Sequence, residues 1–119
     1  GPPQGLGMTP SGKTQSAATE REPGAKTLTA KLGTTVRIHL WEDRTRGELW
    51  VPTYDPAAMP LVDDDFLRIA SGNAADAGRR TFEFKPMTAG TYRLVFEKRM
   101  GWKFTAEDRQ IFYVIVTER

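Results

Sequence analysis

The sequence predicts an all-β protein, an immunoglobulin-like β-sandwich of about seven strands with a disordered N-terminal tail. In several segments apolar and polar residues alternate with a period of two, which is the pattern of a half-buried strand. Turn signals rich in glycine, such as Ser71-Gly72-Asn73, separate these segments. No stretch of useful length has the 3.6-residue period of a helix. The alternation and the spacing of the turns therefore define the fold class.

Three segments carry the clearest alternation, with an apolar side chain at every second position: residues 35–41 (Val36, Ile38, Leu40), 80–85 (Phe82, Phe84) and 91–97 (Tyr92, Leu94, Phe96). Residues 110–117 are apolar on both faces, as in a central strand. Residues 26–32, 47–54 and 65–70 are weaker candidates for strands.

Two local features accompany these strands. Tyr92 opens a strand after Ala89-Gly90, which predicts a tyrosine corner, a phenol that bonds back to the preceding backbone. Residues 104–109 are predicted to form one helical turn, because Thr105 and Asp108 have the spacing of a capping box.

The composition excludes several classes of function. The chain has 119 residues, enough for one domain, and contains no cysteine and a single histidine, His39. Without cysteine it has no disulfide, no thiol nucleophile and no cysteine-ligated metal. A net charge of +2 with interspersed signs does not predict nucleic-acid binding. No apolar run approaches the ~18 residues of a membrane span. We expect a monomer without cofactor or metal.

The chain divides near residue 26. Residues 1–26 are rich in Gly, Pro, Ser and Thr and lack the apolar side chains to support a core, so we expect a tail or linker, and a domain over residues 27–119. The segment from Gly7 to Thr14 fits the phosphate-loop pattern G-x-x-x-x-G-K-[ST]. It lacks the preceding buried strand and the following helix, so we interpret it as coincidence.

No residue set predicts catalysis. His39 lies on the polar face of its strand and has no sequence neighbour that would make it a catalytic base. The run Asp63-Asp64-Asp65 suggests calcium, because hard cations take carboxylate oxygens, but no loop of alternating oxygen ligands surrounds it. We expect it to be a solvated turn before Phe66.

Binding residues are expected in loops, since the loops at one end of such a sandwich cluster. Three connections should share an end: residues 42–48, 71–79 and 99–104. Tryptophan and arginine dominate protein interfaces, and both types occur in or beside these loops: Trp41, Trp102, Arg44, Arg46 and Arg99. Trp50 is expected to pack in the core, whereas Trp102 suits either a contact or a cap of the core.

The same three regions carry recognisable motifs. The first is Asp43-Arg44-Thr45-Arg46-Gly47, followed by Glu48-Leu49-Trp50; the second is Ala75-Asp76-Ala77-Gly78; the third is Arg99-Met100-Gly101-Trp102. In order and spacing they resemble the three binding loops of the chagasin family of cysteine-peptidase inhibitors. Framework segments agree as well: Leu28-Thr29, Leu32-Gly33 and Ala89-Gly90-Thr91. The resemblance extends from about Thr27 to Val116.

The match within each loop is partial. In the first loop the family reads N-P-T-T-G followed by an aromatic residue and Trp, and Thr45, Gly47 and Trp50 agree with it. Gly78 agrees with the Gly-rich second loop, and Trp102 with the R-P-W of the third. Arg44 replaces the family's proline, and Arg46 replaces its second threonine. Because proline fixes φ, this change predicts a looser loop. Three hypotheses follow: weak inhibition, a target with an acidic cleft, or a different partner.

The resemblance implies an inhibitor of papain-like cysteine peptidases, not an enzyme, that occludes the active-site cleft through loops at one end. The implied contact residues are Asp43, Arg44, Thr45, Arg46, Gly47, Ala77, Gly78, Arg99, Met100, Gly101 and Trp102. It also implies a secreted or periplasmic protein, tethered to a membrane through its tail. The alternative is a non-inhibitory protein-binding domain on the same fold, tethered at the cell surface or in the periplasm. Carbohydrate binding through Trp41 and Trp102 is a third hypothesis, without a sugar-specific residue set.

Overall fold

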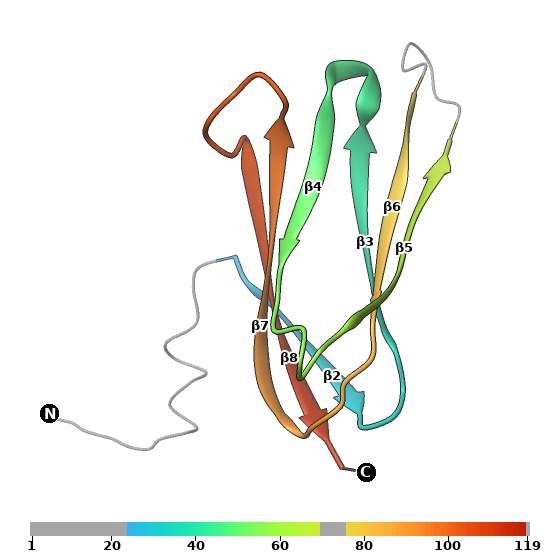
Figure 1. Ribbon diagram of the computed structural model, residues 1–119, viewed down its shortest axis with the longest axis vertical. Helices are drawn as coiled ribbons and strands as arrows, with labels where there is room; N and C mark the ends of the chain where they lie inside the picture. The colour runs from blue at the N-terminus through green and yellow to red at the C-terminus, as the bar shows by residue number, and fades with distance from the viewer. Residues whose placement is uncertain (1–23, 70–75, 119) are drawn as a thin grey trace, which may run out of the picture.

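Two β-sheets pack face to face in the computed structural model, which describes residues 24–69 and 76–118 (Figure 1). One sheet has four strands in the order β2-β8-β7-β4, and the other has three in the order β3-β6-β5. The strands are β2 (Lys26–Lys31), β3 (Val36–Asp43), β4 (Glu48–Thr53), β5 (Leu61–Arg68), β6 (Ala77–Phe84), β7 (Gly90–Met100) and β8 (Asp108–Thr117). The predicted all-β sandwich of about seven strands is confirmed.

The core lies between the sheets and is built from the alternating positions. Val36 and Ile38 of β3, with Phe82 of β6, face Leu94 and Phe96 of β7, and all five are buried. The ring centroid of Phe96 lies 5.1 Å from that of Phe82, 6.1 Å from that of Phe84 and 5.6 Å from that of Phe112. Aromatic pairs at such distances add stabilisation beyond the area they bury, so Phe96 is the centre of the core.

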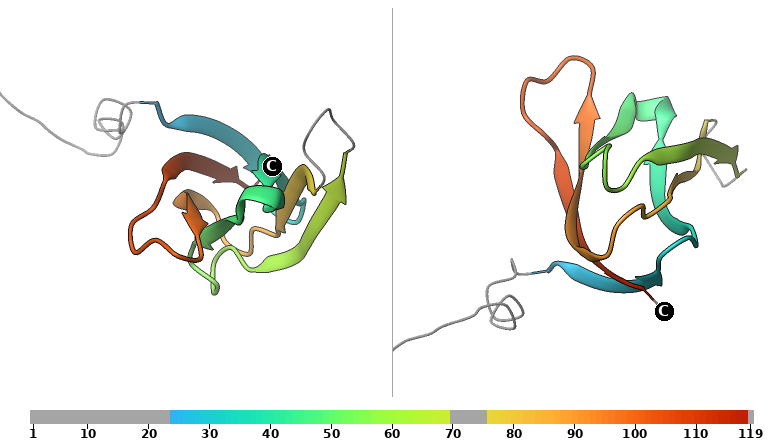
Figure 2. Two further views of the ribbon diagram at one scale, coloured as in Figure 1. Left: turned by 90° about the horizontal axis from the view of Figure 1, so that it is seen from above. Right: turned by 60° about the horizontal axis from the view of Figure 1, so that its bottom comes forward.

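Most neighbouring strands run antiparallel, and one pair does not. β3, β6 and β5 pair antiparallel, as do β4, β7 and β8. β2 instead pairs parallel with β8, with Lys26 opposite Phe112 and Lys31 opposite Thr117. The chain then passes from β2 in one sheet to β3 in the other, so the two sheets are linked near the start of the domain (Figure 2).

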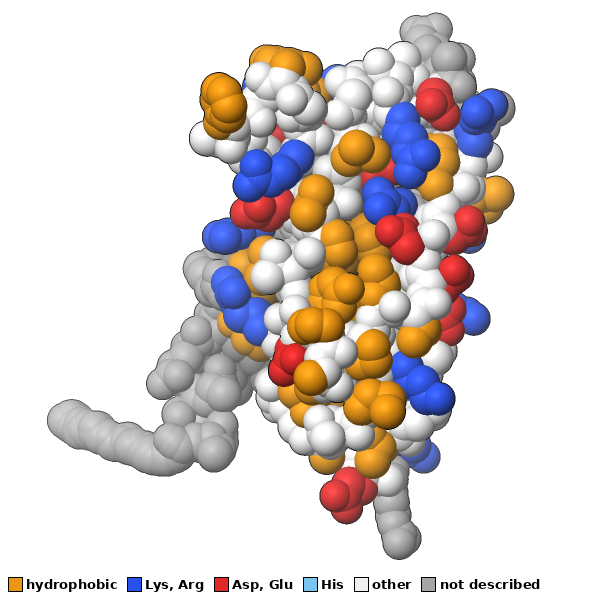
Figure 3. All heavy atoms as spheres, viewed as in Figure 1, with side chains coloured by type: hydrophobic (Ala, Val, Ile, Leu, Met, Phe, Trp, Pro, Cys, Tyr) orange, Lys and Arg blue, Asp and Glu red, His pale blue; other side chains and the backbone are white. Residues whose placement is uncertain are grey.

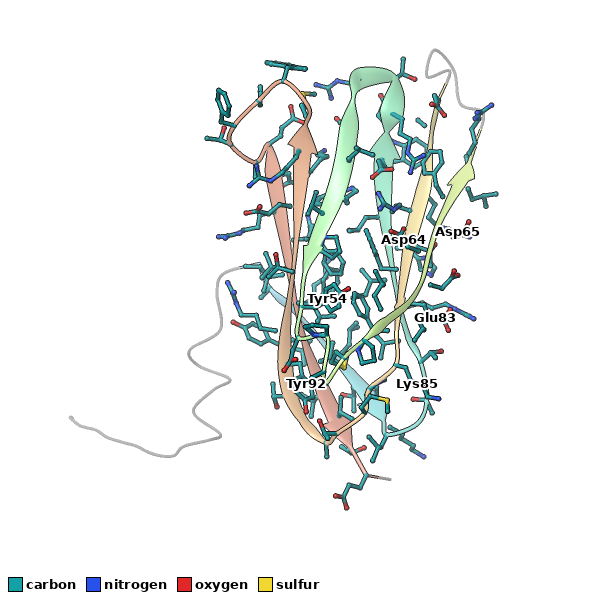
Figure 4. The ribbon with its side chains drawn as sticks, in the orientation of Figure 1. Tyr54, Asp64, Asp65, Glu83, Lys85 and Tyr92 are labelled. Atoms are coloured by element: carbon teal, nitrogen blue, oxygen red, sulfur yellow. The ribbon has the colours of Figure 1, made fainter. Side chains whose placement is uncertain are left out.

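Tyr92 forms the predicted corner at the end where β7 begins (Figure 4). Its hydroxyl lies 3.0 Å from the carbonyl oxygen of Thr88 and 3.2 Å from that of Ala89. It also lies 2.7 Å from the Thr88 hydroxyl. These bonds fasten the β6–β7 connection to the strand that follows it.

Two local expectations are wrong. β5 begins at Leu61, so Asp63, Asp64 and Asp65 lie within a strand and not in a turn. They pair with β6 opposite residues 81–83, and this pairing overrides the low strand preference of aspartate. Residues 104–107 form no helical turn, and β8 begins at Asp108.

In the part of the chain that the structure describes, the helical turn is a 3₁₀ helix, η3 (Arg44–Arg46), between β3 and β4. Within residues 24–69 and 76–118, no helix is both long enough and apolar enough to cross a membrane. β2 begins at Lys26, close to the predicted boundary. The rest of the predicted tail, including the phosphate-loop pattern from Gly7 to Thr14, lies outside the described residues.

Candidate functional site

The β3–β4 connection, the β7–β8 connection and the adjoining ends of β5 and β6 lie at one end of the sandwich, where the loops were predicted to cluster (Figures 1 and 2). The β3–β4 connection, residues 44–47, lies between the β7–β8 connection, residues 101–107, and the adjoining ends of β5 and β6. Of the β5–β6 connection the structure describes Ile69 and Asp76, beside its two strands. The ends of the paired strands agree: Glu48 is opposite Met100, and Asp43 is opposite Ala77. We call this surface the loop end.

The strands reach further into the loop end than the sequence predicts. Glu42, Arg99 and Met100 were expected in loops but belong to strands, as do residues 77–79. The β3–β4 connection is therefore shorter than predicted, and hydrogen-bonded strands support it up to its base. A short connection on paired strands has few conformations open to it.

Hydrogen bonds order the β3–β4 connection. The Asp43 side chain caps η3 by accepting from the backbone N–H of Thr45 at 3.0 Å. Gly47 has φ of +82° and donates its N–H to the Arg44 carbonyl at 3.0 Å. That left-handed conformation favours glycine, which explains why the motif ends with this residue.

The β3–β4 connection is also bonded to the start of β6. The backbone N–H groups of Arg44 and Thr45 donate to the carbonyl oxygen of Asp76 at 2.8 and 3.2 Å. The Thr45 hydroxyl in turn accepts from the backbone N–H of Asp76 at 2.7 Å. This reciprocal pair gives Thr45 a structural role that a small hydroxyl side chain can fill.

Two buried carboxylates lie below the connection, and the sequence analysis missed both. Glu42 is 0% exposed and Glu48 is 2% exposed. Arg44 bonds to Glu42, and Arg46 bonds to Glu48. The guanidinium carbon of Arg44 also lies 3.8 Å from the centroid of the Phe66 ring. An open hollow of about 310 Å³ beside them is lined by Arg44, Gly47, Glu48 and Leu49.

Arg80 connects this cluster to β5. Its guanidinium binds both Asp64 oxygens, at 2.6 and 2.9 Å, and also Glu42 Oε2 at 2.6 Å. The hydrogen bond with Asp64, helped by the charges of Glu42 and Asp64, raises the pKa of Arg80 above its ordinary value. Asp64 is thus the partner of an arginine. Within the described ranges, no group of three or more His, Cys, Asp or Glu residues is arranged to hold a metal ion.

The β7–β8 connection presents two exposed aromatic side chains. Trp102 is 70% exposed and Phe104 is 99% exposed. In Figure 3 hydrophobic side chains stand at the tip of this connection, at the upper left. The connection is ordered by Lys103 N–H, which donates to the Met100 carbonyl at 3.0 Å, and by Arg99 Nη1, which donates to the Phe104 carbonyl at 3.2 Å. Sequence reasoning missed Phe104, although a large apolar residue two positions after Trp102 in a loop was a usable signal.

The remaining predicted residues have other surroundings. Ala77 and Gly78 are buried within β6, and Met100 is buried at the end of β7. A Cβ at Gly78 would lie 2.0 Å from the Leu67 carbonyl oxygen, so glycine is required there by close approach of the backbone of β5.

The other two tryptophans and the histidine differ in how exposed they are. Trp50 packs in the core and donates its ring N–H to the Trp41 carbonyl at 2.7 Å, as a core tryptophan should. Trp41 is half exposed on the outer face of β3. His39 also faces outward, and its Nδ1 lies 2.9 Å from the Thr81 hydroxyl.

The chain was compared with family models, curated sequences and solved structures. Residues 29–116 match the family described as chagasin family peptidase inhibitor I42. A search of curated protein sequences found no match. Among solved structures, the chain is similar to the cysteine protease inhibitor EhICP2 from Entamoeba histolytica, with 18% identity, a TM-score of 0.67, and coverage of 79% of this chain and 88% of that one.

Two further structures share the fold. PbICP-C, solved in complex with falcipain-2, is 18% identical with a TM-score of 0.57, and the match covers 78% of this chain and 89% of that one. Amebosin is 19% identical with a TM-score of 0.56, and the match covers 76% of this chain and 88% of that one.

Proposed function

Because the chain belongs to the chagasin family of peptidase inhibitors, we propose that it blocks papain-like cysteine peptidases by inserting its loop end into their active-site cleft. Members of this family inhibit peptidases, and the chain is an inhibitor and not an enzyme. PbICP-C, whose fold this chain shares, was solved bound to falcipain-2. The proposal extends that mode of binding to this protein.

One observation carries the proposal: a well-supported connection stands beside two aromatic side chains that face solvent. Thr45 and Gly47 are exposed at the tip of the β3–β4 connection, and Trp102 and Phe104 are exposed on the neighbouring one. Exposed apolar patches mark interaction sites, and tryptophan is among the residues that contribute most to binding energy at interfaces. An interface of about 800 Å² per partner would be of standard size.

The predicted contact residues then divide by exposure. We propose that the exposed ones touch the peptidase: Thr45, Arg46, Gly47, Gly101 and Trp102, with Phe104 added. Ala77, Gly78 and Met100 are buried and Asp43 and Arg99 are partly buried, so they would support the exposed residues. Arg44 would also support them, because its side chain is less exposed than that of Arg46, 36% against 58%, and is held by Glu42 and stacked on Phe66. The β3–β4 connection would occlude the catalytic centre, and Trp102 would rest on the cleft wall.

The direct test is a titration of papain and of a cathepsin L-like peptidase with this protein. We expect a stoichiometric loss of peptidase activity, with the inhibitor recovered uncleaved. No inhibition at micromolar concentration would favour the alternative, a protein-binding domain that inhibits nothing. A pull-down from cells would then be the way to find its partner.

The aromatic contact is tested by Trp102→Ala. Loss of a buried interface tryptophan costs about 2 kcal/mol or more, so we expect the inhibition constant to rise by about thirtyfold or more. Met87→Ala is the matched control, since Met87 is 53% exposed in the β6–β7 connection, away from the loop end. Equal inhibition by both variants would remove Trp102 from the interface.

We also propose that the protein acts outside the cytoplasm, secreted or in the periplasm, with residues 1–26 as its tether. The Gly-, Pro-, Ser- and Thr-rich composition of that segment supports a linker. Cell fractionation with an antibody against the folded domain would test this proposal, and recovery with cytoplasmic markers would contradict it.

A further inference from the structure

The β3–β4 connection lacks proline, yet it is held by charged groups beneath it. We propose that Glu42 and Glu48 are positioning residues, which fix the conformation of residues 44–47 by holding Arg44 and Arg46 from the interior. The two arginines would then hold the connection in place, and a target with an acidic cleft would not be needed to explain them. The effect on inhibition rests on the proposed function, whereas the effect on the connection itself does not.

Glu42 links its own strand, β3, to three other parts of the molecule. Its Oε1 accepts from Arg44 Nε at 2.8 Å. Its Oε2 accepts from Arg80 Nη1 of β6 at 2.6 Å and from the backbone N–H of Trp50 in β4 at 2.8 Å. The Trp50 bond joins the two sheets directly, because β3 and β4 belong to different sheets. Both carboxylate oxygens are therefore fully used, and one of these bonds reaches into the connection.

Glu48 repeats the arrangement from the other side of the connection. Its Oε2 accepts from Arg46 Nη1 at 2.9 Å. Its Oε1 accepts from the backbone N–H of Asp43 at 3.2 Å and lies 3.8 Å from Lys98 Nζ. One carboxylate thus bonds the residue before η3 and the last residue within it.

A buried carboxylate is retained at a cost, because removal of a charge from water is unfavourable unless close partners replace the water. Here two such groups lie below one four-residue connection, and each binds an arginine of that connection. Neither glutamate belongs to the hydrophobic core cluster around the buried phenylalanines. Both glutamates bind the β3–β4 connection, and this points to a role in fixing the conformation of residues 44–47.

The anchoring extends to the neighbouring connection. Arg46 Nη2 lies 3.7 Å from Glu107 Oε2, so the same guanidinium joins Glu48 to the β7–β8 connection, where Trp102 stands. The Arg44 guanidinium is bonded to Glu42 and stacked on Phe66. These contacts supply the constraint that a proline would give through its fixed φ. A rigid connection held by ion pairs would therefore replace the looser one that the missing proline predicts.

The test uses trypsin, a serine peptidase that cleaves after arginine and is outside the proposed target class. An ordered connection resists cleavage after Arg44 and Arg46, and a loosened one does not. For Glu42→Gln, Glu48→Gln and the double variant, we expect cleavage at these two sites to accelerate about tenfold or more in the native protein, measured by mass spectrometry. Glu83→Gln is the control, since Glu83 pairs at 3.5 Å with Arg37, an exposed residue outside the connection.

The position of the cuts separates positioning from simple destabilisation. If the glutamates only stabilise the fold, cleavage after Arg37 in β3 and Arg93 in β7 will accelerate in parallel with cleavage after Arg44 and Arg46. Parallel acceleration, or no acceleration at the connection, would overturn the proposal. If a glutamate variant does not fold, Arg44→Ala and Arg46→Ala replace partly exposed side chains instead. Hydrogen exchange at the amides of residues 45 and 47 is then the readout, and unchanged exchange would equally overturn the proposal.

Inhibition gives a second readout. With papain, or with falcipain-2, we expect the double variant to bind about tenfold or more weakly and to be slowly cleaved in the connection, while Glu83→Gln behaves as the parent. If the parent protein inhibits no cysteine peptidase, the proposed function fails, and the trypsin result still decides the role of Glu42 and Glu48.

Discussion

At the scale of single residues, the Tyr92 hydroxyl has one structural role, which is to hold the β6–β7 connection. Its hydroxyl bonds to the backbone of Thr88 and Ala89 at the end of the sandwich away from the loop end. We predict that Tyr92→Phe lowers the free energy of unfolding by about 1–2 kcal/mol, because those bonds are lost while the ring is kept. Urea denaturation measures the change. The inhibition constant should stay unchanged, and a weaker inhibitor would show that the two ends are coupled.

Some residues could be assigned from the sequence, and others could not. Tyr92 and Trp50 were predicted because a turn and an alternating strand define their surroundings. Glu42 and Glu48 were missed, since an acidic residue is by default placed in water, and nothing local shows that a guanidinium distant in the chain will be its partner. Arg80, 38 residues after Glu42, is such a partner.

At the scale of elements, Gly78 and Gly101 of the loop end differ in how much space their backbone leaves for a side chain. In Gly78→Ala the new Cβ would lie 2.0 Å from the Leu67 carbonyl oxygen, so β5 and β6 must separate. We predict a loss of about 1–3 kcal/mol in unfolding free energy, measured by urea denaturation. Gly101→Ala, the control, meets no atom within 4 Å and has no positive φ, so its stability should be that of the parent. Equal stability of both variants would contradict the close approach of β5 and β6.

The strands themselves were predicted from alternation, and their ends were not. Every predicted strand overlaps an observed one. β7 extends to Met100 and β6 begins at Ala77, because pairing with neighbours carries these strands beyond their alternating part. The start of β5 was missed because three aspartates resemble a turn, although Asp64 is held by Arg80. Residues 104–109 have the spacing of a capping box but no apolar face that a helix could bury. They form no helix.

At the scale of the whole molecule, the sandwich followed from strand number and turn spacing, but the strand order did not. The parallel pairing of β2 with β8 joins the start of the domain to its end, and no local pattern encodes it. The gathering of the loop end was expected from the fold class, and it is observed. Its internal bonds, such as those between Thr45 and Asp76, depend on packing that alternation cannot specify.

The domain boundary gives a prediction at this scale. A chain that begins at Gly24 keeps every described strand, because β2 starts at Lys26. We predict the same midpoint of thermal unfolding and the same inhibition constant as for the full chain, measured by circular dichroism and by peptidase titration. A weaker inhibitor would assign a binding role to the first 23 residues.

β8 ends at Thr117, at the pole of the sandwich opposite the loop end (Figure 1). A biotin group or a reporter protein fused after the last residue would therefore point away from any peptidase under study. Molecules attached to a sensor chip through such a group would all expose the loop end to solution. Their association kinetics with a peptidase would then be those of a single, uniformly oriented population.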